Sequence, residues 1–330
     1  MTTQPLVSVI LPTYNRVHVI GRAIASVENQ GYGNYELIIA DDRSIDNTEG
    51  LVRKRMATNS RIKYVTNEYA QGPAGARNFA LTRAGGEYIA FLDSDDYWLP
   101  GHLVEGIAFM QENPNVGLLF TDRITLDTKT GTRTTFLAQY PPFHRLQVET
   151  RGKDFRIIRQ GLFESFMEGN FVTLPTSIVR AASMADLRFD ESLPVASDRD
   201  FLIRLEFERN CVFAARLTPC LVVTRHEGNL SVASAAVDLR YLEARVKSMR
   251  NLTAHGVLTQ QQRDMVERCI LVQISRMPYY HRRLGRYRDA FRTLLRYGSA
   301  FSPASWLMET AKTAGYAVLR RQQKDADSHS

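Results

Sequence analysis

The stretch EYIAFLDSDDYWLP, from Glu87 to Pro100, places an apolar run directly before three closely spaced carboxylates, Asp93, Asp95 and Asp96. An apolar run as short as Tyr88–Leu92 predicts a buried strand of a parallel sheet. The acids then follow the carboxyl end of the strand, where open α/β sheets bind ligands. Carboxylates this close repel one another unless a cation lies among them, and Mg²⁺ and Mn²⁺ prefer oxygen ligands. The stretch therefore predicts a metal-diphosphate site, and the alternative is a helix N-cap with flanking acids.

The composition is that of a globular protein, with 330 residues of which 44% are hydrophobic. Charge is uneven, because residues 1–235 carry a net charge of −2 and residues 236–330 one of +9, which together give the +7 of the chain. No recognised nucleic-acid-binding motif accompanies the basic part, so we expect no nucleic-acid partner. A basic helical segment fits an anionic membrane surface better.

Cysteine content and hydropathy indicate the compartment. Cys211, Cys220 and Cys269 form no CxxC pair and leave one cysteine unpaired in any disulfide scheme, which is typical of a reducing environment. We find no signal-peptide pattern, and no apolar run reaches the roughly 18 residues of a membrane span. We therefore expect a cytoplasmic protein, with peripheral contact at the inner face of the membrane left open.

Short apolar runs alternate with helical patterns through the first 121 residues. This alternation predicts an α/β fold, with a mostly parallel sheet and helices on both faces. The predicted strands are Val7–Leu11, Leu37–Ala40, Ile62–Val65, Tyr88–Leu92 and Val116–Thr121, and the predicted helices are Val19–Asn29, Thr48–Thr58, Ala74–Ala84 and Leu103–Gln111.

The alternation stops after Thr121. From Ala236 the pattern is helical, with predicted breaks near Gly256, Pro278 and Gly298. Between these points the sequence predicts a hairpin turn at Asp127–Arg133, a loop around Tyr140–Pro142, a helix at Phe155–Met167, and strands at Thr176–Val179, Cys211–Ala214 and Leu217–Thr224.

Three further motifs lie at strand or helix ends in the first part of the chain. The first strand ends in PTYNR, which places Thr13, Tyr14 and Asn15 at the carboxyl edge of the sheet, where an aromatic ring can stack on a base. The second strand ends in ADDRSID, where the carboxylate of Asp42 can accept hydrogen bonds from a pyrimidine. In GPAGARN, glycines before a helix allow close backbone approach and place Arg77 beside phosphates. Each motif alone is weak, because Asp, Gly and Asn are ordinary turn formers.

Taken in order, VSVILPTYNR, ADDRSID, GPAGARN and EYIAFLDSDDYWLP resemble the family 2 glycosyltransferases, which have the GT-A fold. The resemblance covers roughly the first 230 residues. It implies transfer of a sugar from a nucleotide-diphosphate donor to an acceptor hydroxyl, with inversion at the anomeric carbon. We accordingly expect a GT-A catalytic domain at residues 1–235, with a nucleotide-binding half at about 1–122 and an acceptor-binding half at about 123–235. A basic helical region follows at residues 236–330.

The resemblance also assigns residues to the donor site. The base-binding carboxylate maps to Asp42, near Tyr14, and Arg77 maps near the nucleotide. The metal-and-diphosphate motif maps to Asp93-Ser94-Asp95, with Asp95 as the direct ligand of Mn²⁺ or Mg²⁺ and Asp93 nearer the ribose. UDP suits the base-binding role of Asp42 best, and GDP and dTDP stay open.

The general base of the family comes from a later acidic motif, commonly Glu-Asp with a further acid two residues on. The segment from Ala196 to Asp200 matches with Ser197 in place of Glu, so the resemblance maps the base to Asp198. Asp200 is expected to face the other way or to pair with Arg204. The alternative for both acids is a capped, salt-bridged surface helix.

Two further residues keep two interpretations each. His226 follows the last predicted strand, where many GT-A enzymes place a histidine near the metal, but a lone histidine is commonly a surface or packing residue. Trp98 suits either a wall of the sugar or acceptor site or an anchor in the core.

Acceptor and partners follow from the family's commonest setting, the synthesis of surface polysaccharides, in which the acceptor is a glycan or a lipid-linked glycan. Acceptor contacts are expected from variable loops such as Thr134–Gly169. The segment from Ser305 to Arg321 suits a peripheral membrane contact or a homo-oligomer, and the alternative is a helical bundle packed on the catalytic domain.

Two rival functions remain at this stage. A metal-dependent nucleotidyltransferase would need a Gly-rich basic loop after the first strand, where this chain has PTYNR. A catalytically degenerate sugar-nucleotide-binding or scaffold protein would not need Asp42, Asp93, Asp95 and Asp198, all of which this chain retains. A metal-dependent hydrolysis assay would separate it from an enzyme.

Overall fold

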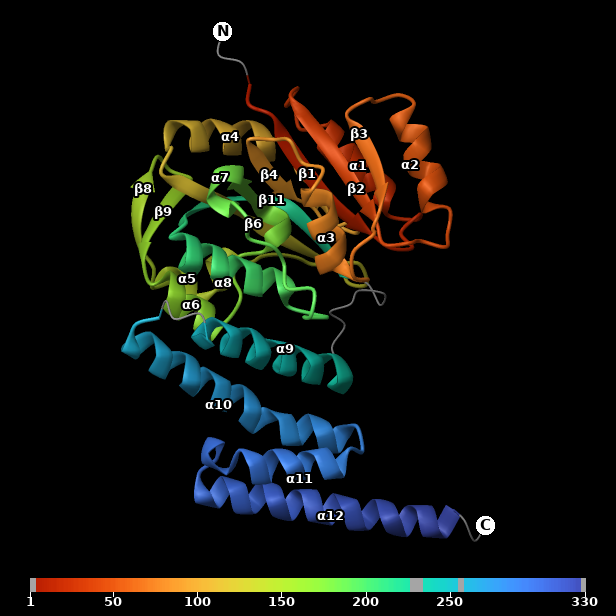
Figure 1. Ribbon diagram of the computed structural model, residues 1–330, viewed down its shortest axis with the longest axis vertical. Coiled ribbons are helices and arrows are strands. Elements are labelled where there is room, and N and C mark those ends of the chain that lie inside the picture. Colours follow the sequence, from red (N-terminus) through yellow and green to blue (C-terminus); the bar gives the residue numbers. More distant parts are fainter. Residues whose placement is uncertain (1–3, 226–233, 255–257, 328–330) are drawn as a thin grey trace. The chain divides into compact units, whose positions relative to one another are not determined.

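The computed structural model describes residues 4–225, 234–254 and 258–327, with side chains described up to residue 224 in the first range and residue 317 in the last. The chain divides into two compact units, Met1–His226 and Glu227–Ser330 (Figure 1). Each unit is described by itself.

The first unit is built on one mixed sheet of 11 strands. Its main path runs β3-β2-β1-β4-β10-β6-β11-β9-β8, with β5 paired to β11 and β7 to β6. Strands β3, β2, β1, β4, β6 and β11 point the same way, and β10 runs antiparallel between β4 and β6. In Figure 1, β8 and β9 form one edge of the sheet. The strands are Val7–Thr13 (β1), Tyr35–Asp41 (β2), Ile62–Thr66 (β3), Tyr88–Phe91 (β4), Tyr97–Trp98 (β5), Val116–Asp127 (β6), Arg133–Thr135 (β7), Gln147–Arg151 (β8), Phe155–Gln160 (β9), Ser177–Arg180 (β10) and Val212–Arg225 (β11).

Helices cover both faces of this sheet, as period-2 alternation of buried side chains requires. Val9 of β1 belongs to the same core cluster as Ile24 of α1 and Ile107 of α4, whereas Phe91 of β4 contacts the ring of Phe201 of α8 on the opposite face. The predicted α/β fold is therefore confirmed. The helices of this unit are Ile20–Glu28 (α1), Thr48–Met56 (α2), Pro73–Leu81 (α3), His102–Glu112 (α4), Pro141–His144 (α5), Leu162–Glu168 (α6), Ala181–Met184 (α7) and Ser197–Arg209 (α8), with 3₁₀ turns at Leu137–Gln139 (η1) and Leu174–Thr176 (η2).

The elements predicted up to residue 121 agree with the structure to within a few residues at their ends. Strand β6 is longer than predicted, and the predicted hairpin turn at Asp127–Arg133 lies between β6 and β7. The expected loop around Tyr140–Pro142 is instead the start of α5. Proline is compatible with the first turn of a helix, because the first N–H groups have no partner within the helix.

The predicted helix at Phe155–Met167 is wrong in its first half, which forms β9. Ile157 of β9 is fully buried between β11 and β8, so pairing on both sides overrides a pattern that can be matched to either a helix or a strand. Gly161, at a φ of 88°, then separates β9 from α6. Glycine adopts this left-handed conformation without steric cost.

The two final strands predicted at Cys211–Ala214 and Leu217–Thr224 are one continuous strand, β11. Its register against β6 shifts between Arg216 and Leu221, which marks an irregularity around Pro219. Proline has no N–H to donate to the strand pairing, so the sequence around Pro219 has the pattern of a strand end although β11 continues.

A buried histidine on α4 gives the first unit an acid-sensitive group. His102 is fully buried beside the ring of Trp98, and neither ring nitrogen has a hydrogen-bond partner among the described residues. Burial, reinforced by the cation of Arg216, lowers the pKa of His102 from 6.5 to about 3. The unfolded chain therefore takes up a proton below pH 6.5 that the folded chain refuses, and this group destabilises the fold as the pH falls from 6.5 towards 3.

We expect the His102→Leu variant to lack this acid sensitivity. Between pH 7 and pH 5.5, the difference in unfolding free energy between wild type and variant should move by about 1 kcal/mol in favour of the variant. Urea denaturation at the two pH values measures it. A difference that stays constant with pH would show that His102 is not held neutral.

The second unit consists of helices. They are Ala235–Ala254 (α9), Gln260–Arg283 (α10), Tyr287–Arg296 (α11) and Pro303–Asp327 (α12), with a 3₁₀ turn at Gly298–Ala300 (η3). The predicted break at Gly298 is confirmed and Gly256 lies outside the described residues, but α10 continues through Pro278. Pro278 and its neighbour Met277 are buried, so packing outweighs the one backbone hydrogen bond that proline removes. Of the described helices, none combines the length and the hydropathy needed to span a bilayer.

Candidate active site

Three strand ends meet at one edge of the sheet. Strand β1 lies between β2 and β4, with Thr13 opposite Asp41 and Ile10 opposite Phe91, so the acidic stretch after β4 begins beside the end of β1. In the strand order, β2 and β3 lie on one side of β1 and β4 lies on the other. Ligands of open α/β sheets bind in the crevice at such a switch point. The structure therefore brings together the PTYNR, ADDRSID and acidic motifs.

Asp42 anchors the loop that leads into α3. Its Oδ1 accepts a hydrogen bond from Asn67 Nδ2 at 2.6 Å, and its Oδ2 accepts one from the backbone N–H of Gly72 at 2.8 Å. Each carboxylate oxygen can accept a second bond, so this carboxylate can still receive a ligand N–H. Gly75 sets how closely this loop packs, because a Cβ there would lie 1.9 Å from the carbonyl oxygen of Ala70.

The residues after β1 differ in how accessible they are. Thr13 is buried, and its Oγ1 has no hydrogen-bond partner among the residues that the structure describes. The ring of Tyr14 is exposed. Asn15, at a φ of 52°, is held by its own backbone N–H to Ser44 Oγ at 2.7 Å and accepts a bond from the N–H of Ile45 at 2.8 Å. An open ring beside a buried hydroxyl suits a stacked base with a polar group nearby.

The acidic stretch is electrostatically strained. Arg77 of α3 is buried and donates to Asp93 Oδ1 at 2.6 Å. Asp93 and Asp95 are half-buried, and Ser94 and Asp96 are buried. Burial raises the pKa of Asp96 well above its usual range, and the neighbouring charges of Asp93 and Asp95 raise it further. The raised pKa of Asp96 shows that the three carboxylates of this stretch are crowded.

This donor set fits a hard divalent cation. The charges of Asp93 and Asp95 help to raise the pKa of Asp96, and a cation relieves repulsion of this kind between carboxylates. Within the described residues, no three His, Cys, Asp or Glu side chains are arranged to hold a metal. Mg²⁺ is commonly held by one or two carboxylates together with substrate phosphates. This stretch can provide the carboxylates. His226, expected either near the metal or diphosphate or as a surface or packing residue, lies outside the described residues.

Trp98 belongs to the core, in agreement with the second of its two interpretations. Its side chain is buried, its Nε1 donates to the carbonyl of Pro175 at 2.8 Å and its ring lies 4.5 Å from that of His102. It therefore offers no wall to a sugar.

The helix that carries the predicted base is α8. Asp198 lies half-buried in its first turn, after Ala196 in the left-handed conformation at a φ of 58°. Asp200 is buried and pairs with Arg204 Nε at 2.7 Å, as predicted. The two acids thus differ, because Asp200 is used within the helix whereas Asp198 is accessible to a ligand.

Phe189 links the candidate donor residues to α8, and no sequence motif indicates this contact. Its ring stacks on Phe201 of α8 at 4.2 Å, lies edge-on to Phe91 of β4 and lies 5.5 Å from the guanidinium of Arg77. The helix of the predicted base and the arginine beside Asp93 therefore share one aromatic neighbour.

Asn78, next to Arg77 in the GPAGARN motif, fixes that ring. Its side chain exchanges two hydrogen bonds of 2.9 Å with the backbone of Phe189 and donates a third to Glu191 Oε1 at 2.8 Å. Glu191 Oε2 in turn accepts from the N–H of Ala70. A buried asparagine with all these groups satisfied rigidifies its surroundings. The position of Asn78 in the motif could have indicated that it matters, but its partner Phe189 lies 111 residues away and could not be predicted.

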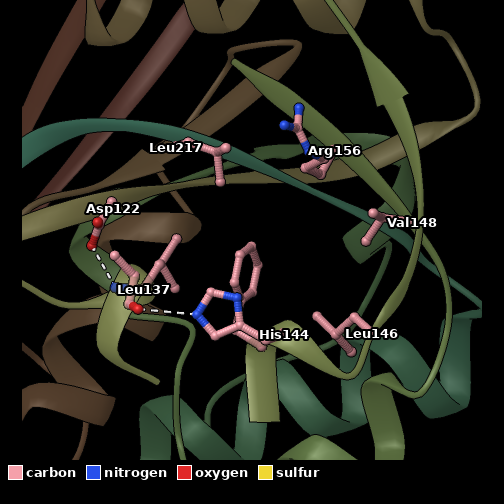
Figure 2. A pocket seen from close by; sticks show the side chains of 9 residues that line it. Asp122, Leu137, His144, Leu146, Val148, Arg156 and Leu217 are labelled. Atoms are coloured by element: carbon pink, nitrogen blue, oxygen red, sulfur yellow. Dashed lines mark hydrogen bonds between the residues drawn. The ribbon is translucent and has the colours of Figure 1, made fainter. Parts of the chain in front are cut away.

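A separate cavity of about 350 Å³ lies in the part of the unit after β6. Apolar side chains dominate its lining, including Leu137, Leu146, Val148 and Leu217, and the ring of His144 lies among them (Figure 2). Asp122 Oδ1 holds one wall by accepting from the N–H groups of Phe136 and Leu137. None of the predicted donor residues lines this cavity. Most of its lining comes from the segment Thr134–Gly169, from which acceptor contacts were expected.

Comparison with known proteins decides the family. The sequence model described as Glycosyl transferase family 2 matches residues 8–166. Over 211 residues, the chain is 31% identical to WcaA of Escherichia coli strain K12, a protein named for colanic acid biosynthesis, and the match covers 63% of this chain and 68% of that protein. The chain belongs to glycosyltransferase family 2.

A further relative and a solved structure are consistent with this family. WfgD of Escherichia coli, a UDP-Glc:alpha-D-GlcNAc-diphosphoundecaprenol beta-1,3-glucosyltransferase, is 50% identical over 115 residues, which are 35% of this chain and 44% of WfgD. The match thus spans less than half of that relative. The crystal structure of S. aureus TarS 1-349 in complex with UDP-GlcNAc superposes with a TM-score of 0.63 at 20% identity, over 96% of this chain and 92% of that one. The predicted family and GT-A fold are confirmed, and the roles of single residues stay predictions.

Proposed function

We propose that this glycosyltransferase moves a sugar from a nucleotide-diphosphate donor, with UDP as the nucleotide, to a hydroxyl of a glycan or lipid-linked glycan acceptor in surface polysaccharide synthesis. The observation that carries the proposal is the joint placement, at one sheet edge, of the Asp42 loop, the Arg77–Asp93 pair and the residues after β1. The names of WfgD and WcaA support the nucleotide and the setting.

In the donor site, Tyr14 stacks on the base, Asp42 accepts from its N–H, and Thr13 and Asn15 line the same edge. Arg77 holds Asp93 near the ribose, and Ser94 shapes the turn between the two acids. Asp95 and Asp93 would hold Mg²⁺ or Mn²⁺, with His226 as a further ligand. When bound, the metal offsets the charge that develops on the departing diphosphate.

Asp198 performs the proton transfer. Its carboxylate accepts the proton of the acceptor hydroxyl as that oxygen attacks the anomeric carbon, and the bond from this carbon to the diphosphate breaks on the opposite side. This direct displacement inverts the anomeric centre. A general base is needed because an alcohol is a weak nucleophile.

The acceptor binds on the side of the cavity lined by Leu137 and His144, whose apolar surface suits the faces of sugar rings. We place the reaction in the cytoplasm, at the inner face of the membrane when the acceptor is lipid-linked. The name of WfgD, which includes a diphosphoundecaprenol acceptor, supports this setting.

A thermal-shift panel tests the donor site. UDP and UDP-sugars should raise the Tm of the wild type only with Mn²⁺ or Mg²⁺, because the proposed site binds the diphosphate through the metal. A ligand at 100 times its Kd stabilises the fold by about 2.7 kcal/mol, which is a measurable shift. GDP, dTDP and CMP are the comparison ligands. The Asp95→Ala variant should lose most of the metal-dependent shift.

The matched control is Asp186→Ala, which removes an exposed carboxylate of the same unit that pairs with Arg209. It should shift as the wild type does, because surface ion pairs contribute little to stability. A chain that shifts with none of these nucleotides would favour the degenerate binding or scaffold alternative.

A further inference from the structure

The second unit exposes apolar side chains that its own packing does not explain. Of the 11 large hydrophobic residues exposed in the described part of the chain, six lie on α10, α11 and α12. The most exposed are Leu295 of α11, at 74%, and Leu307 of α12, at 63%. The others are Val272, Tyr279, Met308 and Tyr316. Single exposed hydrophobic residues are ordinary, but a concentration of them marks an interaction surface.

Helix α12 shows that this exposure is one-sided. Trp306, Thr310 and Thr313 form its inner face, where Trp306 Nε1 donates to the carbonyl of Leu294 at 2.9 Å and Thr313 Oγ1 accepts from Arg282 at 3.2 Å. The opposite side of the same helix is exposed and is mostly small and apolar, with Lys312 at its margin; its small and apolar residues are Ala304, Leu307, Met308, Ala311 and Gly315. An outer face in contact with water alone would be polar.

The same helices are strongly basic. Residues 260–327 contain 13 Lys and Arg against six acids, and within residues 268–317 there are nine Lys and Arg but only two acids, Asp289 and Glu309. Both acids are already in ion pairs, Asp289 with Arg292 and Glu309 with Arg282 and Lys312. Seven of the arginines are exposed, on α10, α11 and the connection between them: Arg268, Arg276, Arg283, Arg286, Arg288, Arg292 and Arg296.

On α11, charge and apolar surface share one face. Arg288, Arg292, Leu295 and Arg296 are exposed together, at the three- and four-residue spacing of one side of a helix, while Ala290 and Leu294 are buried on the other side. Arginines that flank an apolar side chain can reach phosphate groups while the apolar part enters the acyl region. In Figure 1, α11 and α12 run side by side.

We propose that the outer faces of α11 and α12, together with the exposed arginines of α10, form a docking surface for an anionic phospholipid membrane. The proposal goes beyond the transfer reaction and does not depend on it. Complementary charge attracts the surface to acidic headgroups, and Leu295, Leu307 and Met308 enter the interface.

Two other occupants fit these observations less well. A second copy docked through the same face would bring one set of seven arginines against another. A nucleic acid would use the arginines but would leave the aliphatic side chains without a partner. The membrane accounts for both the charge and the apolar surface.

Co-sedimentation of the full chain with vesicles tests the proposal. Vesicles of phosphatidylcholine and phosphatidylglycerol should bind the protein, with weaker binding at high salt, and vesicles of phosphatidylcholine alone should bind at least tenfold less. Leu307→Glu combined with Met308→Glu, and separately Arg292→Ser combined with Arg296→Ser, should each lower the partition coefficient at least tenfold. These positions are exposed, so the variants should keep the wild-type Tm.

Matched controls lie in the first unit. Ile45→Glu changes a residue that is 89% exposed, and Arg133→Ser removes an exposed arginine, and both should bind vesicles as the wild type does. Absence of binding to phosphatidylglycerol vesicles, or binding that survives both double variants, would overturn the proposal. So would a dimer, detected by sedimentation velocity, that the Leu307→Glu/Met308→Glu variant abolishes in a chain that binds no vesicles. Because vesicle binding is measured without donor or acceptor, its outcome is independent of sugar transfer.

Discussion

Replacing Asp198 by asparagine should lower kcat by roughly a hundredfold or more while leaving the Kd of the nucleotide donor unchanged. The amide keeps the size of the side chain in the first turn of α8 but cannot take the proton of the acceptor hydroxyl. Asp198 lies half-buried in the first turn of α8, on a different element from the candidate donor residues, so donor binding should not change. Steady-state kinetics with a UDP-sugar, together with calorimetry of UDP binding, measures both quantities.

A control on the same helix separates proton transfer from a change in the helix. Glu208→Gln removes a half-buried carboxylate near the other end of α8 and should keep kcat within a few-fold of the wild type. If Asp198→Asn also kept kcat, Asp198 would have no part in the chemistry. If the wild type itself bound UDP but transferred no sugar to any glycan acceptor, the degenerate binding protein would be the better description.

The placement of the candidate donor residues at one sheet edge could be predicted, because it depends on local sequence. PTYNR, ADDRSID and the acidic stretch each follow a short apolar run, and parallel strands bring their carboxyl ends to one edge whatever the sequence between them. Hence Thr13, Asp42 and Asp93 were expected to lie at the same edge, and the register of β1 with β2 and β4 places them there. The ion pair of Asp200 with Arg204 was predictable for a similar reason, since it joins residues one helical turn apart.

The connection between the donor side and α8 could not be predicted, because its partners are far apart in sequence. Asn78 and Phe189 are joined by hydrogen bonds across 111 residues, and no pattern near either residue indicates the other. Strand β9 was missed for the same physical reason, since its pairing with β11 and β8 decides between two local patterns that fit equally well. The segment Thr134–Gly169, from which acceptor contacts were expected, contains β9, so the sequence left the geometry of this segment open.

Phe189→Ala should lower the free energy of unfolding by about 3–5 kcal/mol, as expected when a buried aromatic ring is removed and leaves a cavity. The ring is buried and contacts Phe91, Phe201 and Arg77 at once, so neighbouring groups cannot close the gap without moving strand β4 or helix α8. Chemical denaturation of the wild type and the variant measures the loss.

The milder Phe189→Leu variant tests whether this ring also serves catalysis. It keeps an apolar group at the position but removes the stacked contact with Phe201 and the contact with the guanidinium of Arg77. Helix α8 and Arg77 then no longer pack against the same ring, so Asp198 and Asp93 can shift relative to one another. We expect kcat to fall by about tenfold, since small misplacements of reacting groups are costly. Phe109→Leu is the matched control, because Phe109 is also buried and stacked, at 4.2 Å on Phe155, but on α4. Equal losses of stability with a lower kcat only in Phe189→Leu would make Phe189 a positioning residue, whereas equal kcat values would confine it to the core.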